Sequence, residues 1–172
     1  MNRFHISCAS IVCVLLLVGL TASADAETIW DADDGTTVFS KADFADPTLA
    51  ANQDQITSNV ALTREDSLGL YNAVSEGTYV DFTSPIDTEW AFSALNGNPN
   101  FIMGEGAANH GLLTFDDWKT ALNSQAGANI LNTPGVLHLI TNDIYIDIEF
   151  SAWTSGGAGG GFTYTRAVPE PA

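Results

Sequence analysis

Cysteine is almost absent from this sequence, and its placement limits the chemistry available to the chain. Cys8 and Cys13 are the two cysteines, and both lie close to the amino terminus. The residues that follow therefore have no disulfide bond, no thiol nucleophile and no zinc–thiolate site. A domain of about 150 residues buries enough apolar surface to fold without crosslinks.

Basic residues are also scarce, and the formal net charge at pH 7 is −16. After Arg3, the basic residues are Lys41, Arg64, Lys119 and Arg166. Binding to nucleic acid depends on Lys and Arg side chains that displace counterions from phosphates, so we expect no nucleic-acid partner. The favoured explanation of this acidity is that it keeps the protein soluble and opposes self-aggregation. The alternative explanation is that clustered carboxylates bind divalent cations.

The sequence also lacks an apolar run long enough to cross a bilayer, which takes about 20 residues. The run from Ile11 to Leu20 follows Arg3 and precedes small residues that offer cleavage after Ala24 or Ala26. This order is typical of a secretory signal peptide over residues 1–26, with a buried amino-terminal helix as the alternative. We therefore expect a secreted or cell-surface protein whose mature chain has no stable membrane span.

The clearest pattern that is present lies between residues 136 and 166. Apolar residues occupy every second position from Ile144 to Phe150, which predicts a strand with one buried face and one solvated face. Asn142 and Asp143 separate it from the apolar run 136–141, and both tolerate the left-handed backbone of a two-residue hairpin turn. A glycine-rich loop leads to a third alternating run at 162–166, so we expect an antiparallel sheet.

Shorter patterns predict further strands at 28–30, 36–40, 56–64, 69–71, 78–82 and 89–95. One helix is predicted from Phe115 to about Ser124, with Thr114 as its N-cap and with Phe115, Trp118 and Leu122 docking it on the sheet. Strands that are not interleaved with helices favour a mainly β fold, an antiparallel β-sandwich of jelly-roll-like form with one short helix. We expect the signal peptide at 1–26, a single sandwich domain at 27–166 and a tail at 167–172.

An acidic turn is the weak candidate for a metal site. Asp31, Asp33 and Asp34 precede Gly35, but an EF-hand loop requires Asp or Asn at position 35 and Glu at position 42, where this chain has Ala42. A solvated turn is favoured, and calcium in an irregular loop is the alternative. We expect no other cofactor.

The solvated face of the 144–151 strand carries the weak candidates for ligand binding. Asp147 and Glu149 lie about 7 Å apart on one face, a spacing compatible with a hydrolytic carboxylate pair, but a polar outer surface is favoured. Four aromatic residues, Trp90, Tyr145, Trp153 and Tyr164, with nearby Asp and Asn, are candidates for a sugar-stacking platform, although aromatic residues on sheets are more often core.

No constellation in the sequence indicates catalysis. His110 and His138 each lack a neighbouring histidine at metal-ligand spacing, and a Gly-x-Ser-x-Gly nucleophile elbow is absent. The glycine-rich stretch 156–161 precedes a strand, whereas a phosphate cradle precedes a helix, so a flexible hairpin connection or a close backbone approach to another chain is favoured. We therefore expect no enzymatic activity.

The tail Val168-Pro169-Glu170-Pro171 resembles the opening of the PEP-CTERM sorting signal that exosortase handles. In that family a transmembrane stretch and an arginine-rich end follow the motif. Since neither follows here, we expect a truncated form of a longer chain, with an accidental match as the alternative. The resemblance implies bacterial export, processing at the surface and association with extracellular polysaccharide.

The body of the chain is similar to a group of uncharacterised secreted bacterial proteins. The similarity rests on residues 39–43, 45–54, 87–92, 113–118 and 136–164. The group supplies no catalytic residues. We expect a non-enzymatic structural protein of the cell surface or matrix that assembles with itself, as a homo-oligomer or filament. The alternative is a carbohydrate-binding sandwich, with or without calcium, whose partner is extracellular polysaccharide.

Overall fold

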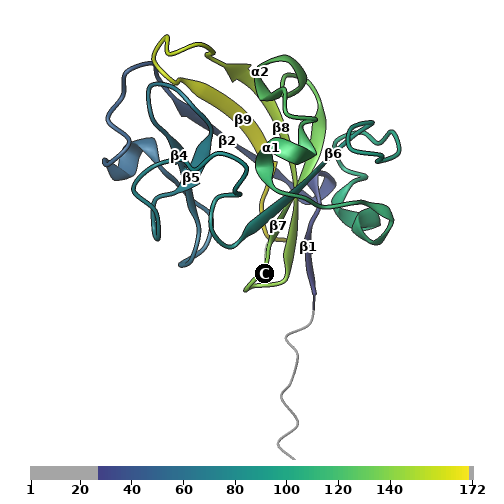
Figure 1. The fold of residues 1–172 in the computed structure, drawn as a ribbon. Helices are drawn as coiled ribbons and strands as arrows, with labels where there is room; N and C mark the ends of the chain where they lie inside the picture. Colours follow the sequence, from purple (N-terminus) through teal and green to yellow (C-terminus); the bar gives the residue numbers. More distant parts are fainter. Residues whose placement is uncertain (1–26, 171–172) are drawn as a thin grey trace, which may run out of the picture.

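The computed structural model describes residues 27–170, and the chain there is mainly β (Figure 1). The expected signal peptide, both cysteines and Pro171 of the tail motif lie outside the described residues. Within residues 27–170, no helix has the length and apolar character to cross a membrane.

Nine strands and five short helices follow one another within residues 27–170. The strands are β1 (Thr28–Trp30), β2 (Thr36–Lys41), β3 (Asp54–Gln55), β4 (Ala61–Arg64), β5 (Leu70–Asn72), β6 (Thr88–Phe92), β7 (Pro134–Leu139), β8 (Ile144–Trp153) and β9 (Phe162–Ala167). The α-helices are α1 (Trp118–Ala121) and α2 (Ala126–Asn129), and the 3-10 helices are η1 (Ala32–Asp34), η2 (Ala50–Asn52) and η3 (Ala107–Leu112).

The larger sheet is built around β8, its longest strand. Its order is β2-β9-β8-β7-β6, with antiparallel neighbours, and β1 joins β8 in parallel. One edge of β8 pairs first with β1, at Ile144 to Ile146, and then with β9, from Ile148 onward. The expected antiparallel pairing of the three carboxyl-terminal strands is confirmed.

The alternation in β8 sorts its side chains as predicted. Ile146, Ile148 and Phe150 are fully buried in the core, while Tyr145 and Glu149 lie on the other face and are half-buried. The predicted two-residue turn before β8 is wrong, because Leu139 pairs with Ile144 and four residues, 140–143, form the connection. Asp143 adopts the left-handed backbone that its residue type tolerates, at φ 49°.

The smaller sheet has the order β3-β4-β5 and is antiparallel throughout. Figure 1 shows β4 and β5 to one side of the larger sheet. Val60, Leu62 and Leu70 from this region belong to the same apolar core as Trp90 and Phe150. The mainly β, antiparallel fold class is therefore confirmed, and the jelly-roll-like arrangement remains an interpretation.

A buried ion pair joins the two sheets. Arg166 on β9 donates from Nε to Asp54 Oδ2 at 2.7 Å and from Nη2 to Asp54 Oδ1 at 3.0 Å, across to β3. Tyr164 donates its hydroxyl proton to the same carboxylate at 2.7 Å. Burial alone would lower the pKa of Arg166, but the hydrogen bonds and charge of Asp54 outweigh it, so this pKa is raised.

The predicted helix is much shorter than the pattern suggested. Asp116 exchanges two backbone hydrogen bonds of 3.0 Å with Trp90, and this bridge holds the backbone before the helix in an extended form. The helix begins at Trp118, and Asp117 rather than Thr114 caps it. Left-handed backbone at Asn123 and Ser124 follows its end, and α2 adds a second turn that the sequence did not predict.

The strands predicted at 28–30 and 36–40 are present as β1 and β2, which pair with β8 and β9 respectively. Two other strand predictions need correction. Residues 78–82 form turns rather than a strand. The predicted 56–64 strand begins only at Ala61, after a turn in which Ile56 and Thr57 both donate to the Val60 carbonyl.

The glycine-rich stretch forms the expected hairpin connection, between β8 and β9, and its close backbone approach is to its own chain. A Cβ on Gly160, whose φ is +64°, would lie 1.7 Å from the Glu65 carbonyl oxygen. Only glycine fits there. This contact places the β8–β9 connection against the segment that follows β4.

Candidate functional site

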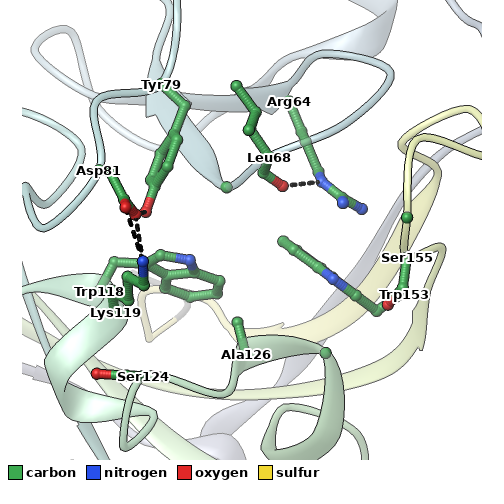
Figure 2. Close-up of a pocket in the computed structure, with 13 residues that line it drawn as sticks. Arg64, Leu68, Tyr79, Asp81, Trp118, Lys119, Ser124, Ala126, Trp153 and Ser155 are labelled. Atoms are coloured by element: carbon green, nitrogen blue, oxygen red, sulfur yellow. Dashed lines mark hydrogen bonds and ion pairs between the residues drawn. The ribbon is translucent and has the colours of Figure 1, made fainter.

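The β8–β9 connection, through Ser155 and Gly156, lines one side of a pocket of about 560 Å³ next to the end of β4. Its other walls come from the 68–81 segment, α1 and α2. Figure 2 shows Arg64 and Trp153 on one side of the opening and Tyr79, Asp81 and Lys119 on the other. The lining therefore combines aromatic rings with charged groups.

Arg64, at the end of β4, is the most unusual residue of the lining. It is only 2% exposed, and its Cζ lies 3.7 Å from the centre of the Trp153 ring, a cation–π contact. Nε donates to the Leu68 carbonyl at 2.8 Å and Nη1 to the Gly161 carbonyl at 3.4 Å. Burial lowers the pKa of the Arg64 guanidinium to about 10, against a smaller opposing effect of the Asp43 charge.

Aromatic residues hold this wall in place. Trp153, the last residue of β8, is half-buried, and its ring centre lies 5.7 Å from that of Trp118. Trp118 is 1% exposed and meets Trp90 edge-on at 4.7 Å. Aromatic pairs at these distances are favourable, so the rings form a rigid base beneath the pocket.

The facing wall is a hydrogen-bonded set of three side chains. Tyr79 donates its hydroxyl proton to Asp81 at 2.9 Å, and Lys119 donates to both Asp81 oxygens at 2.7 Å. The Lys119 bonds, followed by the Tyr79 bond, lower the pKa of Asp81. Burial, followed by the Asp81 bond, raises the pKa of Tyr79. Asp81 is thus a carboxylate whose charge is already balanced by Lys119.

The opposite face of the larger sheet carries a second cluster, which the sequence did not predict. Tyr145 lies between two imidazoles, with ring-centre distances of 3.9 Å to His110 and 4.0 Å to His138. His138 has Glu89 at 2.8 Å and Asp143 at 3.3 Å from its two ring nitrogens. The two histidines, far apart in sequence, are therefore neighbours of one tyrosine, and Tyr145 is distant from the pocket lining.

Asp147 is not part of a polar outer surface, and that prediction is wrong. The residue is 1% exposed, and its carboxylate accepts the Ala107 N–H at 2.9 Å and the Ala32 N–H at 3.3 Å. Burial raises the pKa of Asp147, and these two hydrogen bonds oppose the rise. The segments η3 and η1 cover Asp147, which holds them against the sheet and is inaccessible to a ligand. Glu149 is half-exposed.

The acidic turn has a local structural role. Asp31 caps η1 by accepting the Asp33 N–H at 2.9 Å, and Asp33 and Asp34 are exposed. No group of three or more Asp, Glu, His or Cys side chains within residues 27–170 is arranged to hold a metal ion. Calcium binding at this turn remains an untested prediction.

Of the ligand candidates drawn from the sequence, the structure places Trp153 in the pocket and Tyr145, Asp147 and Glu149 on the other face of the sheet. The residues that sequence reasoning missed are Arg64, Tyr79, Asp81 and Lys119. The scarcity of basic residues in the sequence could have pointed to two of them, because Arg64 and Lys119, two of the four basic residues after Arg3, line this pocket.

No protein-family model matches the chain, and neither the curated proteins nor the solved structures contain a significant match. The PEP-CTERM-like motif and the similarity to secreted bacterial proteins therefore remain predictions from the residues.

Proposed function

We propose that this chain is an exported, non-enzymatic β protein that binds saccharide in the pocket between Arg64 and Lys119. The observation that carries the proposal is the size and lining of this pocket. Its volume of about 560 Å³ lies within the roughly 300–1,000 Å³ of small-molecule sites. A pyranose ring has C–H groups on its faces and hydroxyls around its rim, which suits aromatic rings beside charged and hydroxyl groups.

The lining supports binding in preference to hydrolysis. Glycoside hydrolysis generally uses two carboxylates on either side of the scissile bond. Among the described residues that line the pocket, Asp81 is the one carboxylate, and Lys119 neutralises it. The carboxylates considered from the sequence, Asp147 and Glu149, lie on the other face of the sheet. Recognition of a saccharide therefore requires only groups that the pocket already presents.

A glycan array with the mature protein, followed by titration calorimetry on the best ligands, tests this proposal. Ser155→Trp places a bulky side chain at the exposed rim of the pocket and is expected to reduce affinity at least about tenfold. Ser151→Trp, on an exposed β8 position outside the lining, is the matched control and should bind normally. Absence of binding to any neutral or acidic glycan, or equal affinity of the two variants, would contradict the proposal.

Assembly into extracellular filaments is a second candidate function, supported by the edge of the larger sheet. Among residues 27–170, the outer edge of β2 pairs with no strand, and Val38 on it is 65% exposed. An open edge accepts a strand from a neighbouring molecule. Both β1 and β2 are already paired along one edge within their own chain, so β2 would act as the acceptor.

Negative-stain microscopy over a range of protein and calcium concentrations tests this second function. Filaments are expected to disappear in Val38→Lys, because an edge lysine opposes strand addition. Val74→Lys, at an apolar position that is 50% exposed away from β2, is the control. Monodisperse monomers under every condition would rule out assembly through this edge.

A further inference from the structure

We propose that the pocket selects an anionic saccharide, one that carries a carboxylate or sulfate group, and that Nη2 of Arg64 binds this group. The inference rests on the proposed function, since it names the class of saccharide that the same pocket takes. Three observations on residues 27–170 support the inference: an Arg64 N–H group without a hydrogen-bond acceptor, the absence of a carboxylate within ion-pair distance of Arg64, and the positive net charge of the pocket lining.

The first step concerns the N–H groups of Arg64. A guanidinium has five N–H donors, and here Nε and Nη1 each donate to a backbone carbonyl. Nη2 donates to no atom of residues 27–170. Every fully buried side-chain nitrogen or oxygen in this part of the chain has a hydrogen-bond partner. Because Nη2 has no such partner, it is not fully buried. The open space beside Arg64 is the pocket that it lines.

The second step concerns charge. Among residues 27–170, no carboxylate lies within 4.0 Å of Arg64 or of Lys41, whereas Lys119 and Arg166 each pair with one. Burying a guanidinium without a carboxylate partner is costly. The lowered pKa of Arg64 agrees with this, because it reflects desolvation that the Asp43 charge only partly compensates. A ligand anion would supply the missing partner.

The third step concerns the pocket as a whole. Its charged residues are Arg64, Lys119 and Asp81, which leave a net charge of +1 in a chain of net charge −16. Nη2 and the neighbouring Nη1 are forked donors suited to the two oxygens of a carboxylate or sulfate group. The Trp153 ring that holds the guanidinium also borders the pocket, so a sugar ring bearing the anion has an apolar surface beside it. These features together favour an anionic over a neutral saccharide.

A matched pair of ligands isolates the anionic group. Oligogalacturonate and its fully methyl-esterified form have the same rings and linkages but differ in charge. Titration calorimetry on the mature protein at low salt is expected to give at least about tenfold tighter binding of the acid, as charged hydrogen bonds provide. A sulfated galactan oligosaccharide, compared with its desulfated form, shows whether sulfate serves as well as carboxylate. Inorganic sulfate alone shows whether the sugar ring is needed.

Variants then assign the preference to Arg64. Arg64→Met should abolish the difference between acid and ester, with its fold checked by circular dichroism. Lys41→Met, which removes a buried basic residue outside the lining, should retain the difference. If Arg64→Met does not fold, the comparison of acid with ester on the unaltered protein still decides the inference.

The possible outcomes separate the inference from the function it rests on. Tighter binding of either anionic saccharide, lost in Arg64→Met, supports the inference. Equal binding of acid and ester, with no preference for sulfate, overturns the inference while leaving saccharide binding intact. A preference for the acid that survives in Arg64→Met overturns the role of Arg64. If inorganic sulfate binds and no saccharide does, the claim that the ligand is a saccharide is overturned. If no probe binds, both proposals are overturned.

Discussion

Arg166 and Arg64 are both buried, yet their surroundings differ in one decisive respect. Arg166 meets the Asp54 carboxylate through two hydrogen bonds, and the pKa of its guanidinium is raised. Arg64 meets two carbonyl oxygens and the Trp153 ring, and burial lowers its pKa to about 10. The same residue type thus joins two sheets where the fold supplies an anion, and borders an open pocket where it does not.

The largest expected effect comes from removing the anion beside Arg166. Asp54→Ala leaves a buried guanidinium without a partner, and we expect the free energy of unfolding to fall by about 3–5 kcal/mol. Urea denaturation followed by tryptophan fluorescence measures the change. The double variant Asp54→Leu with Arg166→Met removes both charges and should lose much less. A loss below about 1 kcal/mol in Asp54→Ala would show that the pair does not stabilise the contact between the sheets.

Replacing Arg64 should have a smaller effect on stability. Arg64→Met leaves no stranded carboxylate, and it removes a cation–π contact and two hydrogen bonds to carbonyl groups. We expect the free energy of unfolding to fall by about 1–2 kcal/mol in the same urea titration. A loss as large as that of Asp54→Ala would mean that Arg64 is a structural residue like Arg166.

Removing the carboxylate of the pocket should strengthen binding of an anion. Asp81→Asn raises the net charge of the lining from +1 to +2 and frees Lys119, so we expect oligogalacturonate to bind roughly two- to fivefold tighter at low salt. Calorimetry measures the affinity, and Asp33→Asn, an exposed change outside the lining, is the control. Weaker binding in Asp81→Asn would indicate that Asp81 itself contacts the ligand.

A third buried charge, Asp147, sharpens the comparison through its pH dependence. Its pKa is raised by burial, so the fold binds this proton more tightly than the unfolded chain does. The stability contributed by Asp147 is therefore full below its unfolded pKa of about 3.9 and is lost as the pH rises through the raised value.

Asp147→Asn provides the reference for that measurement. The free energy of unfolding of the unaltered protein, relative to the variant, should decrease from pH 3.5 to pH 7. Thermal unfolding at several pH values gives this difference. A difference that increases with pH would show that the N–H groups of Ala32 and Ala107 outweigh the desolvation of the carboxylate.

The strands were the most predictable part of the molecule, because a period of two depends only on residues close in sequence. The alternation from Ile144 to Phe150 identified both the strand and its buried face. The length of the 115–124 helix was not predictable, since the bridge between Asp116 and Trp90 joins segments 26 residues apart. The parallel pairing of β1 with β8 is likewise a long-range contact.

The pocket could not be assembled from the sequence for the same reason. Its residues come from positions 64 to 156, and turns and the close approach at Gly160 bring them together. Asp147 shows the opposite error, because alternation placed it correctly on the second face but could not reveal the loops that cover it. The scarcity of basic residues marked Arg64 and Lys119 as unusual without indicating that they were neighbours.

The central claim, that the Arg64 side of the molecule binds ligand, is tested most directly by nuclear magnetic resonance during titration with oligogalacturonate. The account predicts that the side-chain signals of Arg64 Nε and Trp153 Nε1 shift together and saturate at the calorimetric affinity. The ring signals of His110 and His138, on the other face of the sheet, should stay unchanged. Shifts confined to the two histidines, with Arg64 and Trp153 unaffected, would contradict the account.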